Sequence, residues 1–337
     1  MSARAFLSRA AIAVALAALA ALGVLDYRFY QGPVPEGESV PVLIPRGAGF
    51  RETARLLERE GILEDARWFY WVGRIRGEDR RIRAGRYLLV PGTPGGRVLH
   101  ALRRGTNEVI RVTVPEGLWV EETVRILADR LGLDEEEIAR AARDTSLVRR
   151  FGVPGPTMEG YLFPETYLFF WDETAETVLG RMTARFREVF GEEEEARAAE
   201  MGLTPREAIT LASIVEAEAV VDEERPRIAA VYHNRLEIGW KLQADPTVQY
   251  ARKSRERLLL RDLETDSPYN TYLHTGLPPG PICSPGEASI RAVLRPTEGS
   301  RELFFVANGE NGRHTFSRDQ NGHIRAKREA KRRRQSP

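Results

Sequence analysis

The chain has very little cysteine, and its histidines show no metal-binding pattern. One cysteine, Cys283, occurs among 337 residues, so no internal disulfide bond can form. The five histidines lack HxxxH or HxH spacing, so we expect neither a metal nor another cofactor. Phosphate-binding loops, GxGxxG motifs and GxSxG motifs are absent in the required contexts. Charge of one sign is not in excess, because 50 Lys and Arg face 49 Asp and Glu, and nucleic acid is not an expected partner.

The sequence does contain enough apolar residues for folded domains, with 42% hydrophobic and 29% charged residues, and its length predicts about two domains. One long uncharged run stands out. It extends from Ala10 to Leu25 after Arg4 and Arg9, and aromatic residues expected at a membrane interface follow it. At 1.5 Å per residue the run covers about 24 Å of a roughly 30 Å hydrocarbon core, so a membrane span there needs its neighbours. The aromatic residues are Tyr27, Phe29 and Tyr30.

Three interpretations of this run remain open: an uncleaved single-pass membrane anchor, a cleaved signal peptide, and an apolar core helix of a soluble protein. We prefer the anchor. Basic residues before the run predict that this end is cytoplasmic, so the rest of the chain would lie outside the cytoplasm at the cell (inner) membrane. In a cell with an outer membrane, that location is the periplasm.

The predicted fold class is α+β, in six parts. These are residues 1–30, a cytoplasmic tip and transmembrane helix; 31–41, a Pro- and Gly-rich tether; 42–106, an α+β subdomain with the order strand, helix, helix, strand; 107–150, a second strand–helix segment; 151–322, a mixed α/β domain; and 323–337, a basic end expected to be disordered. VLIPRG at 42–47 and VTVPEG at 112–117 both place Pro-x-Gly between a strand and a helix, so an internal duplication is one interpretation.

The candidate chemistry lies on the predicted helix 204–220, whose C-terminal half is almost wholly apolar until Glu216 and Glu218. Helical residues two apart point about 200° apart, so both carboxyls cannot face one site. Glu216 continues the apolar stripe of Ile209 and Ala212, where burial would raise its pKa as a general acid requires. The alternative is a structural glutamate at the helix end that caps a neighbouring loop or pairs with Arg227 or Arg235.

Amides, carboxylates and aromatic rings, which bind carbohydrate, are dense in the rest of the predicted 151–322 domain. Five prolines between Ser267 and Pro285 predict an ordered loop that lines a cleft. The candidate substrate-binding residues are Glu159, Tyr161, Glu218, Asn234, Gln243, Asp245, Tyr269, Asn270 and Tyr272.

Six motifs together resemble the YceG-like family of endolytic murein transglycosylases. They are EGYLFPETY (159–167), LASIVEAEA (211–219), NRL (234–236), LQADPTVQYA (242–251), SPYNTYLHTGLPPGPICSPG (267–286) and LFFVANGENGRHTFS (303–317). The resemblance extends from the anchor to about Asn321. Ala217 replaces the Lys of many members, and the Arg-rich end after Ile324 lies outside the family pattern.

The resemblance implies a single-pass membrane protein whose 42–106 subdomain is LysM-like and whose catalytic acid is Glu216. It also implies cleavage of nascent peptidoglycan glycan strands to leave 1,6-anhydro-muramic ends, with proteins of cell-wall synthesis as further candidate partners. Two alternatives remain open: a non-catalytic envelope scaffold that binds glycan, and a muramidase that uses water.

Overall fold

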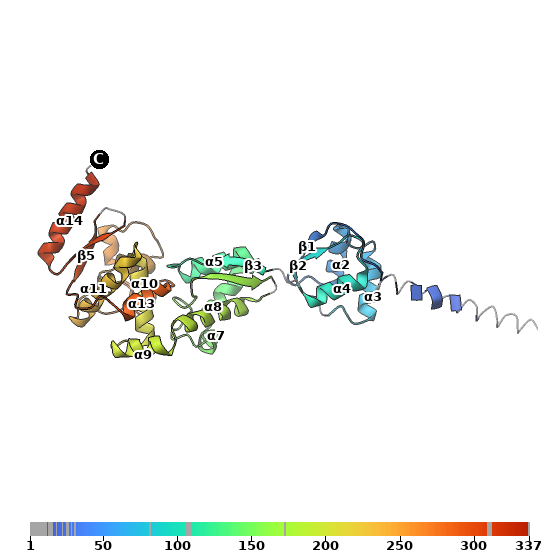
Figure 1. Cartoon of the computed structure of the whole chain (residues 1–337), viewed down its shortest axis with the longest axis horizontal. Coiled ribbons are helices and arrows are strands. Elements are labelled where there is room, and N and C mark those ends of the chain that lie inside the picture. Colours follow the sequence, from blue (N-terminus) through green and yellow to red (C-terminus); the bar gives the residue numbers. More distant parts are fainter. Residues whose placement is uncertain are drawn as a thin grey trace, which may run out of the picture. The chain divides into compact units, whose positions relative to one another are not determined.

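The computed structural model describes residues 12, 16–17, 19–21, 23–24, 27, 29, 32–80, 82–105, 109–171, 173–308 and 312–335. The chain divides into two compact units (Figure 1). The N-terminal unit takes residues 1–110 and 168–173, and the C-terminal unit takes residues 111–167 and 174–337. Most of the segment 107–150, which we expected as a separate part, therefore belongs to the larger unit.

Of residues 10–25, where the sequence predicts the membrane segment, half lie outside the described residues. Of the helices that the structure does describe, none is both long and apolar enough to cross a membrane.

The N-terminal unit packs three helices against an antiparallel strand pair. Strands β1 (Val40–Ile44) and β2 (Gly85–Leu89) pair so that Val42 lies opposite Tyr87. Val42 and Ile44 are buried while Leu43 between them is exposed, as alternation along a strand requires. The helices are α2 (Phe50–Arg59), α3 (Ala66–Ile75) and α4 (Gly95–Arg104). The order β1, α2, α3, β2 is the predicted order of elements.

Phe29 differs from its predicted place at a membrane interface. It is 9% exposed and belongs to the core of the N-terminal unit, with its ring 6.3 Å from that of Phe69 in α3. A Cβ built on Gly95 would lie 2.3 Å from the Phe29 ring, so the missing side chain at Gly95 makes room for it. The Phe29 ring is thus buried in the core of the N-terminal unit.

The C-terminal unit is mainly helical. Strand β3 (Val109–Thr113) pairs with β4 (Thr166–Phe170). The chain passes from one unit to the other within β3, after residue 110, and again within β4, after residue 167. Further along, β5 (Phe304–Ala307) pairs with β6 (His314–Ser317) in antiparallel register. The helices are α5 (Val120–Leu131), α6 (Glu135–Arg143), α7 (Thr145–Arg150), α8 (Ala175–Val189), α9 (Glu192–Glu200), α10 (Pro205–Glu218), α11 (Arg225–Glu237), α12 (Asp245–Ala251), α13 (Glu287–Leu294) and α14 (Gln320–Gln335), with short 3-10 turns at Asp222–Glu224 and Leu260–Glu264.

Helix α10 is the centre of this unit. Every residue from Ala208 to Glu216 is buried, and the helix packs against α11 and α13 (Figure 1). Its start follows local rules, because the Thr204 hydroxyl accepts the Glu207 N–H, the Glu207 carboxylate accepts the Thr204 N–H, and Pro205 occupies the first turn. The helix thus carries Glu216 and Glu218 at its C-terminal end.

The basic C-terminal residues form α14, whereas the sequence predicts a disordered end. Ala326 and Ala330 are one turn apart, are 4% and 5% exposed, and lie on a helix that contacts β5 and β6. The two alanines therefore mark the buried face of a helix whose other faces carry charge.

Candidate active site

The two carboxylates at the end of α10 enter different surroundings, as the helical geometry predicts. The Glu216 side chain is 7% exposed, and its Oε2 accepts the N–H of Gly286 at 3.0 Å. Nη1 of Arg225, at the start of α11, lies 3.2 Å from the same oxygen. Glu216 therefore pairs with Arg225, and the predicted alternatives Arg227 and Arg235 are engaged elsewhere. Arg227 pairs with Glu302, and Arg235 donates to backbone carbonyls.

Arg225 is a buried cation at the centre of a charge cluster whose outer members, Asp222 and Glu116, are exposed. Its side chain is 8% exposed, its Nε lies 3.0 Å from Asp222 Oδ1, and its Nη1 donates to the Ser289 hydroxyl. Nη2 lies 3.9 Å from the Glu116 carboxylate. Burial and the charge of Glu216 raise the pKa of Glu116, while Arg225 opposes them. The cluster thus joins α10, α11 and the turn before α5.

Backbone contacts bring Glu116 to this cluster. The Gly117 N–H donates to the Ser284 carbonyl at 2.8 Å, and the Ser284 N–H donates to the Leu118 carbonyl at 2.9 Å. A Cβ on Gly286 would meet the Glu116 carboxylate at 1.9 Å, so glycine permits the close approach. The Pro-x-Gly turn marked this segment in the sequence, but nothing marked Glu116 as a neighbour of α10.

Glu218 lies on the wall of a cavity of about 480 Å³. Its Oε1 accepts the hydroxyl of Tyr232 at 3.0 Å. Burial raises the pKa of Glu218 to about 7, and the nearby charge of Asp245 acts in the same direction, against Tyr232 and Arg235. Glu218 is thus a cavity carboxyl whose proton is exchangeable near neutral pH.

Three other predicted residues line the same cavity: Gln243, Asp245 and Tyr272. Asp245 Oδ1 accepts the Tyr272 hydroxyl at 2.6 Å. Gln243 has φ +50, and its N–H donates to the Thr271 carbonyl at 3.1 Å. This hydrogen bond joins the motif at 242–251 to the motif at 267–286. Gln243, Asp245 and Tyr272 line the cavity together with residues from β5, β6 and α14.

The sequence did not single out the part of the wall that α14 supplies. Gln320, His323 and Lys327 line the cavity, as do Phe304 of β5 and His314 of β6. The His323 ring stacks on Phe304 with ring centroids 5.0 Å apart, and burial lowers the pKa of His323. Phe304 and His314 belong to the motif at 303–317, whereas no motif covered the three α14 positions and no helix was expected there.

The remaining predicted residues lie in structural contacts. The Asn234 amide donates to the Ser300 and Glu302 carbonyls at 3.0 and 2.9 Å, and the buried Asn270 amide donates to the Leu263 and Thr265 carbonyls at 2.9 and 2.8 Å. These side chains fix loops around the cavity and are not among the residues that line it.

Glu159 belongs to a separate buried group with Tyr161 and Tyr269. Its two oxygens accept the Val120 N–H and the Tyr250 hydroxyl, each at 3.1 Å, and burial raises its pKa to about 8. Tyr250 stacks near Tyr269 with ring centroids 4.9 Å apart, while Tyr161 is buried against Phe186. Glu159 therefore joins the start of α5 to α12 and is not among the residues that line the Glu218 cavity.

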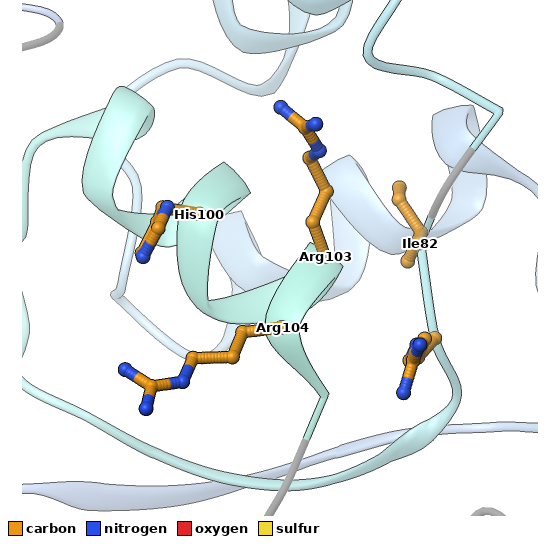
Figure 2. Close-up of a pocket in the computed structure, with 5 residues that line it drawn as sticks. Ile82, His100, Arg103 and Arg104 are labelled. Atoms are coloured by element: carbon orange, nitrogen blue, oxygen red, sulfur yellow. The ribbon is translucent and has the colours of Figure 1, made fainter.

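A cavity of about 640 Å³ in the N-terminal unit offers no comparable acid. Ile82, Arg83, His100, Arg103 and Arg104 line it, and Figure 2 shows Arg103 and Arg104 pointing in different directions. Arg103 also lies 3.5 Å from the Glu78 carboxylate. Among the described residues, no group of three or more His, Cys, Asp or Glu is placed to hold a metal ion.

Comparison with known proteins identifies the family to which the motifs of this site belong. The model of the YceG-like family matches residues 42–329. The chain belongs to the YceG-like family. An endolytic murein transglycosylase of Bacillus subtilis strain 168 is 30% identical over 86% of this chain and 84% of its own length.

Two further relatives extend the comparison. An endolytic murein transglycosylase of Streptococcus pneumoniae serotype 2 is 28% identical, and the match covers 93% of this chain but 63% of that protein. A crystal structure of a YceG-like protein from Listeria monocytogenes has a TM-score of 0.60 and 28% identity, covering 86% of this chain and 99% of that one. The mixed α+β fold of this chain is therefore a YceG-like fold.

Proposed function

We propose that the protein is an endolytic murein transglycosylase that cleaves peptidoglycan glycan strands and that Glu218 transfers the proton. The cavity around Glu218 carries the proposal, because it combines a carboxyl of pKa about 7 with polar and aromatic walls. The relatives named endolytic murein transglycosylase support the reaction class. Glu216 as the acid remains the alternative, and its contacts with Arg225 and Gly286 favour a positioning role.

The proposed reaction needs one carboxyl and no water. Protonated Glu218 donates its proton to the glycosidic oxygen, and the bond from that oxygen to C1 of the muramic residue breaks. The resulting carboxylate then removes the proton from the C6 hydroxyl of the same sugar, whose oxygen bonds to C1 and closes a 1,6-anhydro ring. Glu218 thus regains its proton, and no second nucleophilic carboxylate is required.

Asp245 has the position and charge to assist this step. It lines the cavity with Glu218, and the Tyr272 hydroxyl fixes one of its oxygens at 2.6 Å. We infer that Asp245 stabilises positive charge that develops on the sugar ring and also raises the pKa of Glu218.

Product mass tests the proposed reaction. Purified glycan strands treated with the full chain should give fragments whose cut ends are about 18 Da lighter than hydrolysis products, because no water is added. Ends with the mass of hydrolysis would support a muramidase. Strands that are bound and left intact would support a scaffold.

We further propose that residues 10–25 anchor the chain in the cell membrane, with both units outside the cytoplasm, and that the N-terminal unit is LysM-like and positions glycan. The charge pattern around the apolar run supports the anchor. Proteins of cell-wall synthesis are the further partners we would test. Recovery of a mature chain that begins near Ala21 in the soluble extracytoplasmic fraction would instead identify a signal peptide.

A further inference from the structure

Helix α3 in the N-terminal unit carries apolar side chains on two opposite faces. Ala66, Phe69 and Gly73 are buried against the rest of the unit. Three large apolar residues point away from that core and are highly exposed: Trp68 at 45%, Trp71 at 57% and Ile75 at 81%. At 100° per residue these three fall within about 60° of one another, opposite the buried face. We call Trp68, Trp71 and Ile75 the outward face of α3.

Basic residues border this face. Arg67 and Arg74 are exposed and lie about two helical turns apart on one side of the outward face. Arg74 Nη1 donates to the Tyr70 hydroxyl at 3.2 Å. Tryptophan and arginine beside an aliphatic side chain form the combination favoured where hydrocarbon meets lipid headgroups. Arginine also attracts the phosphate groups of anionic lipids.

Two described residues that follow the apolar N-terminal run, Tyr27 and Phe29, lie beside α3 within the same unit. Phe29 packs on Phe69 of α3, and Tyr27 and Trp68 line one cavity of about 610 Å³. Described apolar residues of the run itself, such as Leu16 and Leu19, are more than 60% exposed. If that run enters a bilayer, it brings α3 to the bilayer surface.

We propose that the outward face of α3 lies in the headgroup region of an anionic phospholipid bilayer and holds the N-terminal unit on the membrane surface. The inference rests on the proposed membrane attachment and adds a second contact to it. A helix of ten residues lying flat there would bury three apolar side chains while Arg67 and Arg74 reach phosphate.

Tryptophan quenching by brominated lipids tests this contact in the full chain. Residues 1–31 contain no tryptophan, so quenching cannot come from the anchor. The chain in phosphatidylcholine and phosphatidylglycerol vesicles should lose emission when the acyl chains carry bromine, and bromine near the headgroup should quench more than bromine near the methyl end. Trp68→Phe with Trp71→Phe should remove most of the quenching. Trp240→Phe is the matched control, because Trp240 is also 45% exposed but lies in the C-terminal unit.

Two results overturn the inference while leaving membrane attachment intact: vesicle-bound chain without quenching, and quenching that the double variant retains. An emission shift at Trp68 and Trp71 that soluble glycan fragments produce and lipid does not would also overturn it, in favour of a sugar-binding face. Chain that does not float with vesicles at all refutes the attachment itself.

Discussion

Glu216 and Glu218 are two residues apart on one helix, yet the protein surrounds them in opposite ways. Glu216 meets a guanidinium and a backbone N–H in a cluster that ties three segments together. Glu218 meets a tyrosine hydroxyl on the wall of a cavity, where burial brings its pKa to about 7. The two residues are of the same type, so the opposite directions of their side chains and the groups around each one determine what each carboxyl can do.

Replacement of each carboxyl by its amide should give the largest difference in turnover between the two residues. Glu218→Gln should lower turnover by about 10²–10⁴-fold, because an amide cannot shuttle the proton. Glu216→Gln should stay within about tenfold of the wild type per folded molecule, since its amide can still accept the Gly286 N–H. Release of anhydro-ended fragments measures both rates, and circular dichroism reports folding. The opposite ranking would return the acid role to Glu216.

Stability should show the reverse ranking. Glu216→Gln leaves the buried Arg225 with less compensating charge, so the free energy of unfolding of the C-terminal unit should fall by about 2 kcal/mol. Glu218→Gln at pH 8 should not lower it, because the amide carries no buried charge. Glu193→Gln, which removes an exposed partner of Arg295, should cost less than about 1 kcal/mol. Urea unfolding at pH 8 compares the three, and equal losses would contradict the two roles.

The pH dependence of stability and of turnover should report the protonation of Glu218. Its pKa rises from 4.5 to about 7 on folding, so the protonated form is favoured in the folded state. The associated stability is fully present below about pH 4.5 and is lost as pH rises toward 7. Turnover should likewise fall above about pH 7, because the acid must be protonated. Glu159, with a pKa of about 8, adds a similar loss of stability, so the informative quantity is the difference between wild type and Glu218→Gln. Identical pH profiles of stability would show that Glu218 does not titrate in this range.

The smallest shift is expected for Asp245→Asn, which should lower turnover at every pH and should move the pH above which turnover falls downward by less than about one unit. The reason is that Asp245 raises the pKa of Glu218 through its charge. Asp266→Asn is the control, since Asp266 is exposed and does not line the cavity. A midpoint that moves upward, or moves equally in both variants, would contradict the coupling.

Local sequence signals predicted much of the fold. Thr204, Pro205 and Glu207 fix the start of α10, and the 100° step per residue separates the directions of Glu216 and Glu218. The strand and helix periods also gave the order of β1, α2, α3 and β2. These features depend on residues within a few positions of one another, which is why the sequence alone reveals them.

The choice between the carboxylates could not be predicted in this way. Glu116 and Gly286 come to Glu216 from 100 and 70 residues away, and Arg225 lacks a motif that marks it. On the other side, α14 supplies Lys327 and His323 to the Glu218 cavity, although its composition favours disorder. Contacts between distant parts of the sequence thus place Glu216 beside Arg225 and Glu218 in the wall of a cavity.

Titration of the Glu218 side-chain carboxyl by carbon NMR directly tests whether this carboxyl carries a proton near neutral pH. In chain with labelled glutamate, the signal that disappears in Glu218→Gln belongs to this group. We expect a midpoint near pH 7 for that signal in the folded wild type. A midpoint near 4.5, the ordinary value for glutamate, would contradict this expectation, because Glu218 would then carry no proton to donate at neutral pH.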